Sequence, residues 1–372
     1  MEEKDMRAKK VTAITMAALV AMGSLAACGS NTGGSAGSSA SDSNTATTSA
    51  SASGETLKVG TMPLTCGIPV LYAQDQGYFK DAGLNVDVEL FATGAPINEA
   101  IAAKELDIAV SGFASVYSLA NADCSWIADV NTTGGMGLFA RADSDIAKAP
   151  EKDGIIGSAD TLKGLKVLEP LGTAVQYMTE SYAAKYGLTP DQIKQVNMEY
   201  ASAYQAFTTG EGDIVALNPP YSYQILNAGD YKELTTFEDA TGVTMCDGAF
   251  VRNDVKDKRS EDIQKFVDCL VKAEDALQDD SLREEYTKKV YEDNAISSTD
   301  DDIKNEIADR KYVGTDYMKK SDYVLGEAWV AITDFLVEAE KIDADNAPNV
   351  KKSIDASYVS KTTGTEISTS AS

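Results

Sequence analysis

Apolar residues follow two different periods in the part of the chain after residue 56. Segments 57–60, 83–90 and 106–110 show the alternation or the short apolar runs typical of β-strands. Segments 69–77 and 95–104 lie between them and have the spacing of amphipathic helices. The resulting β-α-β-α-β order predicts a parallel sheet with helices packed on its faces.

A second unit with the same order of elements follows. It consists of three strands and two helices, expected at residues 164–168, 174–186, 195–200, 203–209 and 213–217. Asp107 and Asp213 each stand near the start of the third strand of their unit. Two similar three-strand units predict an α/β protein with two similar lobes, each built on a mostly parallel sheet.

Two seven-residue segments with similar sequences follow these units. Gly-Leu-Phe-Ala-Arg-Ala-Asp occupies residues 137–143, and Gly-Ala-Phe-Val-Arg-Asn-Asp occupies residues 248–254. Both suit strands that cross between the lobes, so they are expected to form the hinge. The predicted organisation is lobe 1 over residues 55–141, lobe 2 over 142–248, and a completion of lobe 1 with C-terminal helices over 249–349.

Four helical stretches follow the second crossover and are expected to be decoration without a functional role. They cover residues 261–278, 281–292, 300–309 and 322–341. Residues 350–372 are expected to form a loosely held tail.

Residues 1–27 have the features of a secretory signal peptide. A basic start is followed by an uncharged run over residues 11–24, which is shorter than the roughly 20 residues of a membrane span. The segment ends in Leu-Ala-Ala-Cys-Gly, which resembles the lipobox of bacterial lipoproteins, so Cys28 is the expected site of lipidation. Acidic residues precede Met6, which leaves both Met1 and Met6 as possible starts.

Residues 28–54 are expected to be a flexible tether. Small and polar residues make up nearly all of this segment, so it cannot bury a core. The domain is therefore expected at the cell membrane, anchored by lipid on the extracytoplasmic face, and stable anchoring requires more than one acyl chain.

Composition argues against several kinds of function. A net charge of −25 disfavours nucleic acid as a partner, because phosphates require a basic face. The chain has no histidine, which removes Ser-His-Asp and Cys-His catalysis and the commonest metal ligand. No enzymatic activity, metal or cofactor is expected.

Four cysteines follow Cys28, and they are Cys66, Cys124, Cys246 and Cys269. Their wide spacing fits no zinc motif. An even number outside the cell permits up to two disulfides, with three possible full pairings. Buried free cysteines are the alternative.

Short motifs run in a fixed order from residue 57 to residue 213. They are Leu-Lys-Val-Gly (57–60), Gly-Ile-Pro (67–69), Tyr-Ala-Gln (72–74), Gly-Tyr-Phe (77–79), Gly-Leu (83–84), Leu-Asp-Ile-Ala (106–109), Ser-Gly (111–112), Leu-Lys-Gly-Leu-Lys-Val (162–167), Gly-Thr (172–173), Gly-Leu-Thr-Pro (187–190), Ala-Phe (206–207), Gly210 and Asp213. In these motifs the mature chain resembles the bacterial solute-binding proteins of nitrate, sulfonate and taurine importers, grouped with binders of thiamine-pyrimidine precursors. The helical C-terminal third adds little to the resemblance.

This resemblance implies a type II periplasmic-binding-protein fold, in which two lobes close on a ligand like a Venus flytrap. It also implies the partners, which are a small-molecule solute, an ABC permease and its ATPase. The protein is then expected to be a monomer that binds no nucleic acid and reaches the membrane through its lipid anchor.

The loops after the predicted strands are the candidate site. In open α/β sheets, ligands bind beyond the carboxyl ends of the strands, where glycines allow close backbone approach and hydroxyls can hydrogen-bond. Helix capping is the alternative role of the Ser and Thr residues there. The candidate ligand-binding residues are Thr65, Cys66, Gly67, Thr93, Gly94, Ser111, Gly112, Phe113, Met136, Gly172, Thr173, Tyr204, Asn218 and Tyr221.

These loops contain no Arg or Lys, so an anion would depend on amide N–H groups and hydroxyls, without a bidentate arginine clamp. Aromatic residues in the loops could stack on the body of a ligand. An organic sulfonate or similar small anion is the favoured solute, and a neutral heteroaromatic or pyrimidine-like solute is the alternative. An enzyme of the pyrimidine-synthase-like branch is less favoured, since that chemistry implies a histidine. A Cys66–Cys246 disulfide beside the cleft is a further hypothesis.

Overall fold

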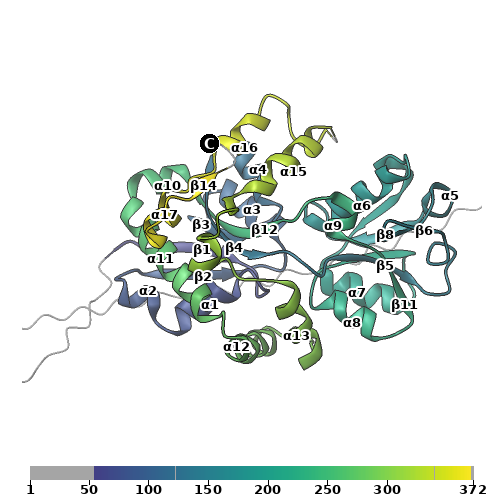
Figure 1. Cartoon of the computed structure of the whole chain (residues 1–372), viewed down its shortest axis with the longest axis horizontal. Helices are drawn as coiled ribbons and strands as arrows, with labels where there is room; N and C mark the ends of the chain where they lie inside the picture. Colours follow the sequence, from purple (N-terminus) through teal and green to yellow (C-terminus); the bar gives the residue numbers. More distant parts are fainter. Residues whose placement is uncertain (1–53, 122, 339, 370–372) are drawn as a thin grey trace, which may run out of the picture. The chain divides into compact units, whose positions relative to one another are not determined.

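The computed structural model describes residues 54–121, 123–338 and 340–369. The predicted signal peptide, Cys28 and all of the tether except Gly54 lie outside the described residues. The described part contains two five-stranded sheets with helices packed around each (Figure 1). The α/β class and the two similar lobes predicted from the sequence are confirmed.

Sheet A is the framework of lobe 1, and its strand order is β2-β1-β3-β12-β4. Strands β2, β1 and β3 are parallel, and β12 runs antiparallel to β3 and β4 on its two sides. The strands are β1 (Leu57–Thr61), β2 (Val86–Leu90), β3 (Ile108–Ser111), β4 (Cys124–Thr132) and β12 (Cys246–Arg252), and the helices between them are α1 (Ile68–Asp75), α2 (Tyr78–Asp81), α3 (Gly94–Ala102) and α4 (Ser115–Ala120). Strand β2 begins later than predicted because Gly83 turns the chain at a φ of 76°.

Sheet B is the framework of lobe 2 and repeats this arrangement, with the order β9-β8-β10-β5-β11. Strands β9, β8 and β10 are parallel, and β5 is antiparallel to β10 and β11. The elements are β5 (Gly137–Arg141), β8 (Lys166–Glu169), α6 (Ala174–Lys185), β9 (Lys194–Asn197), α7 (Tyr200–Thr208), β10 (Ile214–Leu217), α8 (Tyr221–Asn227), β11 (Tyr231–Thr236) and α9 (Phe237–Thr241), with short β6 (Glu151–Lys152), β7 (Ile155–Ile156), α5 (Ala159–Leu162) and η1 (Pro190–Gln192) at its edge.

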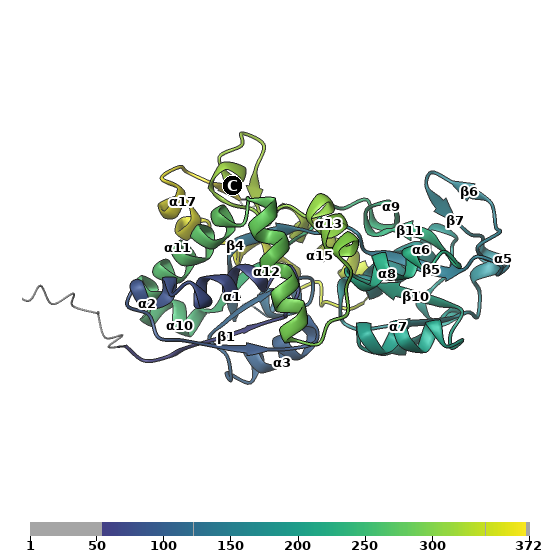
Figure 2. The same cartoon turned by 90° about the horizontal axis from the view of Figure 1, so that it is seen from below.

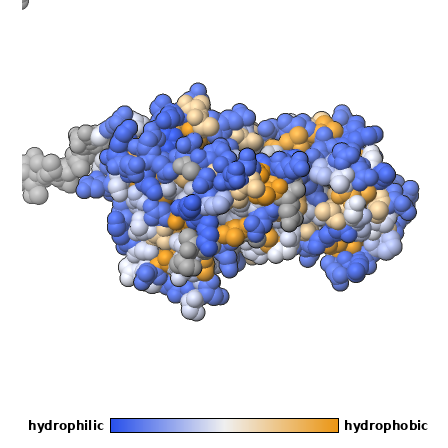
Figure 3. All heavy atoms as spheres, turned by 90° about the horizontal axis from the view of Figure 1, so that it is seen from above, coloured by the Kyte–Doolittle hydropathy of each residue, from blue (hydrophilic) through white to orange (hydrophobic). Residues whose placement is uncertain are grey.

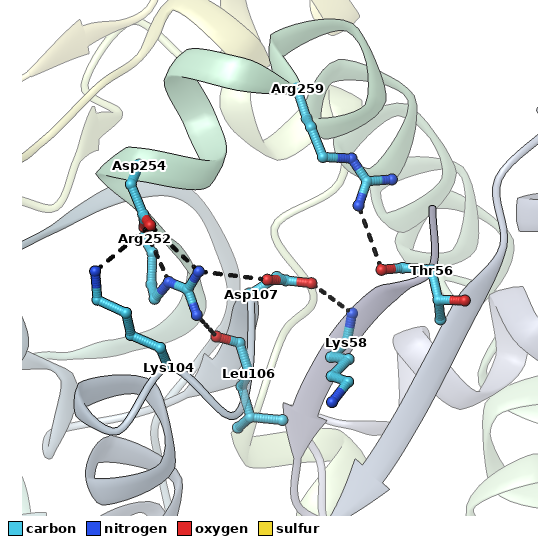
Figure 4. A network of polar contacts seen from close by, with 8 residues as sticks. All are labelled: Thr56, Lys58, Lys104, Leu106, Asp107, Arg252, Asp254 and Arg259. Atoms are coloured by element: carbon cyan, nitrogen blue, oxygen red, sulfur yellow. Dashed lines mark hydrogen bonds and ion pairs between the residues drawn. The ribbon is translucent and has the colours of Figure 1, made fainter. Parts of the chain in front are cut away.

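Asp107 and Asp213 accept equivalent hydrogen bonds in the two lobes. Asp107 Oδ2 accepts a hydrogen bond from the backbone N–H of Lys58 at 3.0 Å (Figure 4). Asp213 Oδ2 accepts one from the backbone N–H of Lys166 at 2.8 Å. Each carboxylate therefore ties the start of one parallel strand to the next.

Two arginines at equivalent positions bind next to these aspartates. Arg252 Nη1 donates to the carbonyl of Leu106 at 2.8 Å, and its guanidinium lies between Asp107 and Asp254 (Figure 4). Arg141 Nη1 donates to the carbonyl of Gly212 at 2.9 Å in lobe 2. The similar segments 137–143 and 248–254 are thus equivalent strands in the two sheets.

The chain changes lobes in two places that hydrogen-bond to each other. The first crossing lies between Thr132 and Gly137, and the second lies between β11 and Cys246. The backbone N–H of Thr133 donates to the carbonyl of Met245 at 2.9 Å, and the hydroxyl of Thr133 donates to the same oxygen at 3.0 Å. Strand β5 pairs within sheet B, so the change of lobe comes earlier than the predicted boundary at residue 141.

The helices after β12 pack on lobe 1 and also reach lobe 2. They are α10 (Asn253–Lys258), α11 (Ser260–Ala276), α12 (Asp280–Asp293), α13 (Asp300–Asp309), α14 (Thr315–Met318), α15 (Glu327–Glu338), α16 (Ala347–Lys352) and α17 (Ser357–Thr363). Figure 2 shows α13 and α15 near the middle of the described fold. Helix α13 contacts α8, and Phe335 of α15 packs against Tyr177 of α6 with ring centroids 4.5 Å apart.

Two predictions about the C-terminal segment are wrong. The expected helix over 322–341 begins later, with α15, because β13 (Val324–Leu325) pairs with β14 (Ser368–Thr369) just before it. The expected loose tail is instead packed, because Trp126 exchanges backbone hydrogen bonds with Ser353 and Asp355 at 2.9 Å each. The apolar side chains of this segment are therefore part of the core of lobe 1.

Hydrophilic residues cover most of the face shown in Figure 3, and apolar residues form small separated patches there. The described helices include none that is both long enough and apolar enough to cross a membrane.

Candidate functional site

A cleft lies between the two lobes and encloses about 510 Å³ of space not filled by atoms, its open mouth included. Its walls come from the carboxyl ends of β1, β3 and β10, from the N-terminal end of α6, and from the first crossing. The lining residues are Met62, Leu64, Cys66, Gly94, Gly112, Phe113, Ala114, Thr133, Met136, Thr173, Ala174, Tyr200, Asn218, Asp247 and Arg310.

Half of the residues predicted from strand ends line this cleft. They are Cys66, Gly94, Gly112, Phe113, Met136, Thr173 and Asn218. Four others, Gly67, Thr93, Ser111 and Gly172, are chain neighbours of lining residues but do not line the cleft themselves.

The remaining three predicted residues do not line the cleft either. Thr65 is buried behind its wall, where its hydroxyl bonds to Arg310 and Glu306. Tyr221 lines a neighbouring groove that also contains Leu90. Tyr204 packs against Tyr221 with ring centroids 5.9 Å apart and lines neither space.

Helix N-termini approach the cleft from both lobes. Gly94 begins α3 in lobe 1, and Ala174 begins α6 in lobe 2. Neither helix has a side-chain N-cap, and the hydroxyl of Thr173 donates instead to the carbonyl of Pro170 at 2.8 Å. The first N–H groups of both helices therefore keep donors and positive dipole ends that suit an anion.

Close backbone approach requires glycine at two positions, one in the cleft wall and one beside it. A Cβ on Gly67 would lie 1.9 Å from the carbonyl oxygen of Met62, inside the first turn after β1. A Cβ on Gly112 would lie 2.3 Å from Asp247 Oδ1, so this glycine makes room for the carboxylate.

Arg310 is a lining residue that strand-end reasoning missed. It follows α13 and is only 2% exposed. Its guanidinium donates to the carbonyl of Gly134 at 2.9 Å, to Thr65 Oγ1 at 3.3 Å and to Asn218 Oδ1. Arg310 thereby contacts lobe 1, lobe 2 and the first crossing together. An arginine therefore lines the cleft although the strand-end loops contain none, and it follows α13, a helix that was expected to be decoration.

Asp247 is the second lining residue that the sequence did not reveal. It lies near the start of β12, one position before Gly248, which pairs with Ser111 at the carboxyl end of β3. Because β12 is antiparallel to β3, the beginning of β12 falls at the edge where the parallel strands end. Only the knowledge of that pairing would have placed Asp247 in the cleft.

The cleft keeps its tyrosine and cysteine neutral and its arginine charged. Burial raises the pKa of both Cys66 and Tyr200 well above the usual range of each group. Burial opposes the charge of Arg310, but the carboxylates of Asp247 and Glu306 raise its pKa overall. Cys66 is therefore a poor nucleophile, because the thiol and not the thiolate predominates.

The hypothesis of a Cys66–Cys246 disulfide is wrong, since the four cysteines of the described chain are all free. Successive side chains of a strand point to opposite faces. Asp247 faces the cleft, and Cys246 instead lines a separate cavity with Asp129 and Trp329.

Two α/β lobes that face each other across a cleft define the periplasmic-binding-protein fold. The chain belongs to the NMT1-like family, whose pattern matches residues 50–290. A protein of Brachyspira hyodysenteriae named as an ABC transporter periplasmic binding protein is 28% identical over 319 residues, which are 84% of this chain and 91% of that protein.

Solved structures share the fold at low sequence identity. The alkanesulfonate-binding protein SsuA from Xanthomonas axonopodis, bound to MOPS, aligns with a TM-score of 0.62 and 15% identity over 81% of this chain and 98% of its own. The nitrate-binding protein NrtA from Synechocystis aligns with a TM-score of 0.63 and 14% identity over 83% and 88%. The desulfurization enzyme DSZB has a TM-score of 0.55 at 12% identity, over 83% and 99%, so the fold alone does not separate binding from catalysis.

Proposed function

We propose that this protein is the solute-binding lipoprotein of an ABC importer. Lipid on Cys28 anchors it to the extracytoplasmic face of the membrane, and it passes a small organic solute to the permease and its ATPase. The solute carries an anionic group, with an organic sulfonate as the best candidate, and the two lobes close around it. The membership of the NMT1-like family and the relative named as a periplasmic binding protein support the transport role.

The position of Arg310 between the lobes is the observation that carries the anion assignment. Three of its five N–H donors are used by Gly134, Thr65 and Asn218, which leaves one on each terminal nitrogen. A guanidinium with a remaining donor on each terminal nitrogen can bind an anionic group through two oxygens. The N-termini of α3 and α6 add positive dipole ends from opposite lobes.

Closure follows from the same contacts. Arg310 bonds to Asn218 of lobe 2 and to Thr65 of lobe 1, so its full set of hydrogen bonds requires both lobes to be near each other. A solute that touches both helix N-termini makes more contacts in the closed state than in the open state. Such differential binding is what shifts the population toward the closed state.

An enzymatic role finds less support in the cleft. The chain has no histidine, and the thiol of Cys66 is held in its protonated form by burial. General acid–base or nucleophilic catalysis needs a group whose pKa is close to the working pH. A neutral heteroaromatic solute is less favoured because it would leave the remaining donors of Arg310 without an anionic acceptor.

A ligand screen tests the proposal. Thermal unfolding would be followed with alkanesulfonates, nitrate, aromatic carboxylates and pyrimidines, because a ligand at one hundred times its Kd adds about 2.7 kcal/mol of stability. We expect a small organic anion to raise Tm and to reduce the radius of gyration measured by small-angle X-ray scattering. Arg310→Gln should abolish the shift, whereas Lys148→Gln, at an exposed position, should leave it unchanged. A shift with pyrimidines alone would contradict the anion assignment.

The lipid anchor is tested separately. Cys28→Ala should release the full-length protein from the membrane fraction, and labelled palmitate should enter the wild-type protein but not the variant. Equal membrane association of the two proteins would contradict the lipoprotein assignment.

A further inference from the structure

A second cavity lies on the face of β12 opposite the cleft. It encloses about 860 Å³ of space not filled by atoms, its open mouth included, compared with about 510 Å³ for the cleft. Neighbouring side chains of β12 point to opposite faces, so Asp247 lines the cleft and Cys246 lines this cavity. Thr132, at the start of the first crossing, and Thr244, within the second, also line it. We call this space the hinge cavity, and it shares no lining residue with the cleft.

Carboxylates outnumber basic groups in the hinge cavity. The acidic lining residues are Asp129, which is 3% exposed, and Asp322 and Glu327, which are exposed. Lys320 is the one basic residue among the lining residues. The excess of negative charge favours a cation in this space.

Asp129 is a buried carboxylate whose hydrogen-bond donors are all neutral. Its Oδ1 accepts from Trp126 Nε1 at 2.7 Å, and its Oδ2 accepts from the Tyr323 hydroxyl at 2.9 Å and from the backbone N–H of Gly326 at 3.5 Å. Among the described residues, no Lys or Arg nitrogen lies within 4.0 Å of these oxygens. Burial raises the pKa of Asp129 to about 6, so the group is still ionised at pH 7.5. A buried charge without a counter-charge is costly, and a bound cation supplies that counter-charge.

Aromatic side chains form another part of the cavity lining. They are Tyr317, Tyr323 and Trp329. The rings of Tyr317 and Tyr323 are nearly perpendicular, with centroids 6.0 Å apart. Lys320 Nζ lies 3.9 Å from the centre of the Tyr317 ring, so an ammonium group already uses this ring face. Lys320 is exposed and can turn into solvent when another cation takes its place.

We propose that the hinge cavity is a second binding site of this protein, for a small organic cation whose charged group is a quaternary ammonium. The carboxylates supply the opposite charge, and the aromatic rings supply faces that attract alkylated ammonium groups. A quaternary group suits the site better than a primary one, because Trp126 and Tyr323 already donate to the two oxygens of Asp129 and leave little acceptor capacity for N–H donors. This site is separate from the solute cleft and does not depend on what the cleft binds.

The experiment compares choline with 3,3-dimethylbutan-1-ol, in which a carbon atom replaces the charged nitrogen and the shape stays the same. Calorimetry at pH 7.5 should show that the wild-type protein binds choline at least about tenfold more tightly than this alcohol. It should also bind choline more tightly than 2-aminoethanol, whose ammonium is primary. Asp129→Asn should lower the affinity for choline at least about tenfold. Its amide can still accept from Trp126 and donate to Tyr323, so the shape of the wall is kept.

A second variant tests the aromatic lining and does not disturb the buried carboxylate. Tyr317→Leu, at a half-buried position, should lower the affinity for choline about three- to tenfold. Asp334→Asn is the matched control, because it removes a carboxylate at an exposed position of α15 outside the cavity. Its affinity for choline should equal that of wild type.

The outcomes separate this inference from the transport proposal. No binding of choline, or equal binding of choline and 3,3-dimethylbutan-1-ol, overturns the hinge-cavity site, and so does tighter binding of 2-aminoethanol. Undiminished affinity in Tyr317→Leu overturns it without recourse to Asp129→Asn. Arg310→Gln should bind choline as wild type does, and a loss there would place choline in the cleft and overturn the inference. The response of Arg310→Gln to anions tests the transport proposal independently.

Discussion

Several buried charged or ionisable groups of this protein form hydrogen bonds with neutral partners. Arg310 is the example in the cleft, and Glu169 is one at the carboxyl end of β8. Glu169 is fully buried, and its Oε2 accepts from the hydroxyl of Thr179 at 2.5 Å, while its Oε1 has no hydrogen-bond partner among the described residues. Burial, together with the nearby Glu180, raises the pKa of Glu169 to about 8 despite that hydrogen bond.

Glu169 predicts a pH dependence of stability. A carboxyl whose pKa is raised by folding binds its proton more tightly in the folded state, so the folded state holds more protons between about pH 4.5 and pH 8. The free energy of unfolding should therefore fall as pH rises through that window. Glu169→Gln should remove this loss, making the variant more stable than wild type at pH 8.5 by at least about 1.4 kcal/mol, the equivalent of one pKa unit.

Urea denaturation at pH 5 and pH 8.5 measures the effect, with the exposed Glu89→Gln as a control for the change of charge. A wild-type protein that gained stability on going from pH 5 to pH 8.5, with Glu169→Gln changing in parallel, would contradict the role of Glu169.

Among the elements, the clearest repeat is the set of contacts that two arginines make where the third parallel strand of each sheet begins. Arg141 and Arg252 occupy equivalent positions on β5 and β12. Each donates to the carbonyl of the residue just before the aspartate of its own lobe, which is Gly212 or Leu106. Arg141 also lies 4.4 Å from the ring centre of Phe207. Each guanidinium thus joins an antiparallel strand, β5 or β12, to the parallel strands of its sheet.

Replacing either arginine should destabilise its lobe. Arg141→Lys and Arg252→Lys keep the charge but lose the fork that reaches the carbonyl, so each should lower the free energy of unfolding by about 1–3 kcal/mol. The double variant should show nearly the sum, because the two sites share no partner. Lys104→Gln, in the network of Figure 4 but with a side chain that is 68% exposed, should change stability by less than about 0.5 kcal/mol. Guanidinium denaturation measures all four, and equal losses for Lys104→Gln and Arg252→Lys would contradict this account.

The packed C-terminal segment makes a second prediction for the elements. Ile354 is 7% exposed and forms a bridge with Trp126, so Ile354→Ala should cost about 2–5 kcal/mol. Lys351→Ala, at an exposed position of α16, should cost less than about 0.5 kcal/mol. The shift of the urea midpoint measures both. A small effect of Ile354→Ala would show that the segment is as loosely held as its sequence suggests.

The sequence predicts the parallel strands of both sheets because short apolar runs mark them. Asp107 and Asp213 stand at the start of the third strand in each unit, so this signal also lies within a few residues of the strand that it marks. It does not predict where β12 pairs, since antiparallel pairing with β3 joins residues that are far apart in the chain. For the same reason the strand-end rule finds Gly94 and Thr173 but misses Asp247 and Arg310. The burial of Val350 and Val359 could not be predicted from the polar sequence around them, because it depends on contacts with lobe 1.

At the scale of the whole molecule, the C-terminal helices connect the lobes. Tyr223 of lobe 2 donates from its hydroxyl to Asp309 Oδ2 at 2.5 Å, and Asn227 donates to Asp302 Oδ1 at 2.8 Å. Lys341 lies 3.4 Å from Glu180. These contacts place α13 and the residues after α15 where they influence how readily the lobes separate.

Tyr223→Phe should favour the open form. The loss of one hydrogen bond between lobes costs about 1 kcal/mol of the closed state and leaves each lobe intact. The radius of gyration of the ligand-free protein should increase in small-angle X-ray scattering. Tyr182→Phe is the matched control, because it removes a buried hydroxyl that bonds to Ile156 within lobe 2. Identical scattering from Tyr223→Phe and Tyr182→Phe would contradict a closing role for Tyr223.

The order of strands along the chain has a consequence for secretion. Sheet B needs only residues 137–236, whereas sheet A needs β12 to fill the gap between β3 and β4. A chain threaded from its N-terminus through a translocation channel therefore delivers all of lobe 2 before lobe 1 can be completed. We expect lobe 2 to fold first. Until residue 252 emerges, β3 and β4 have unpaired edges, which are prone to aggregation.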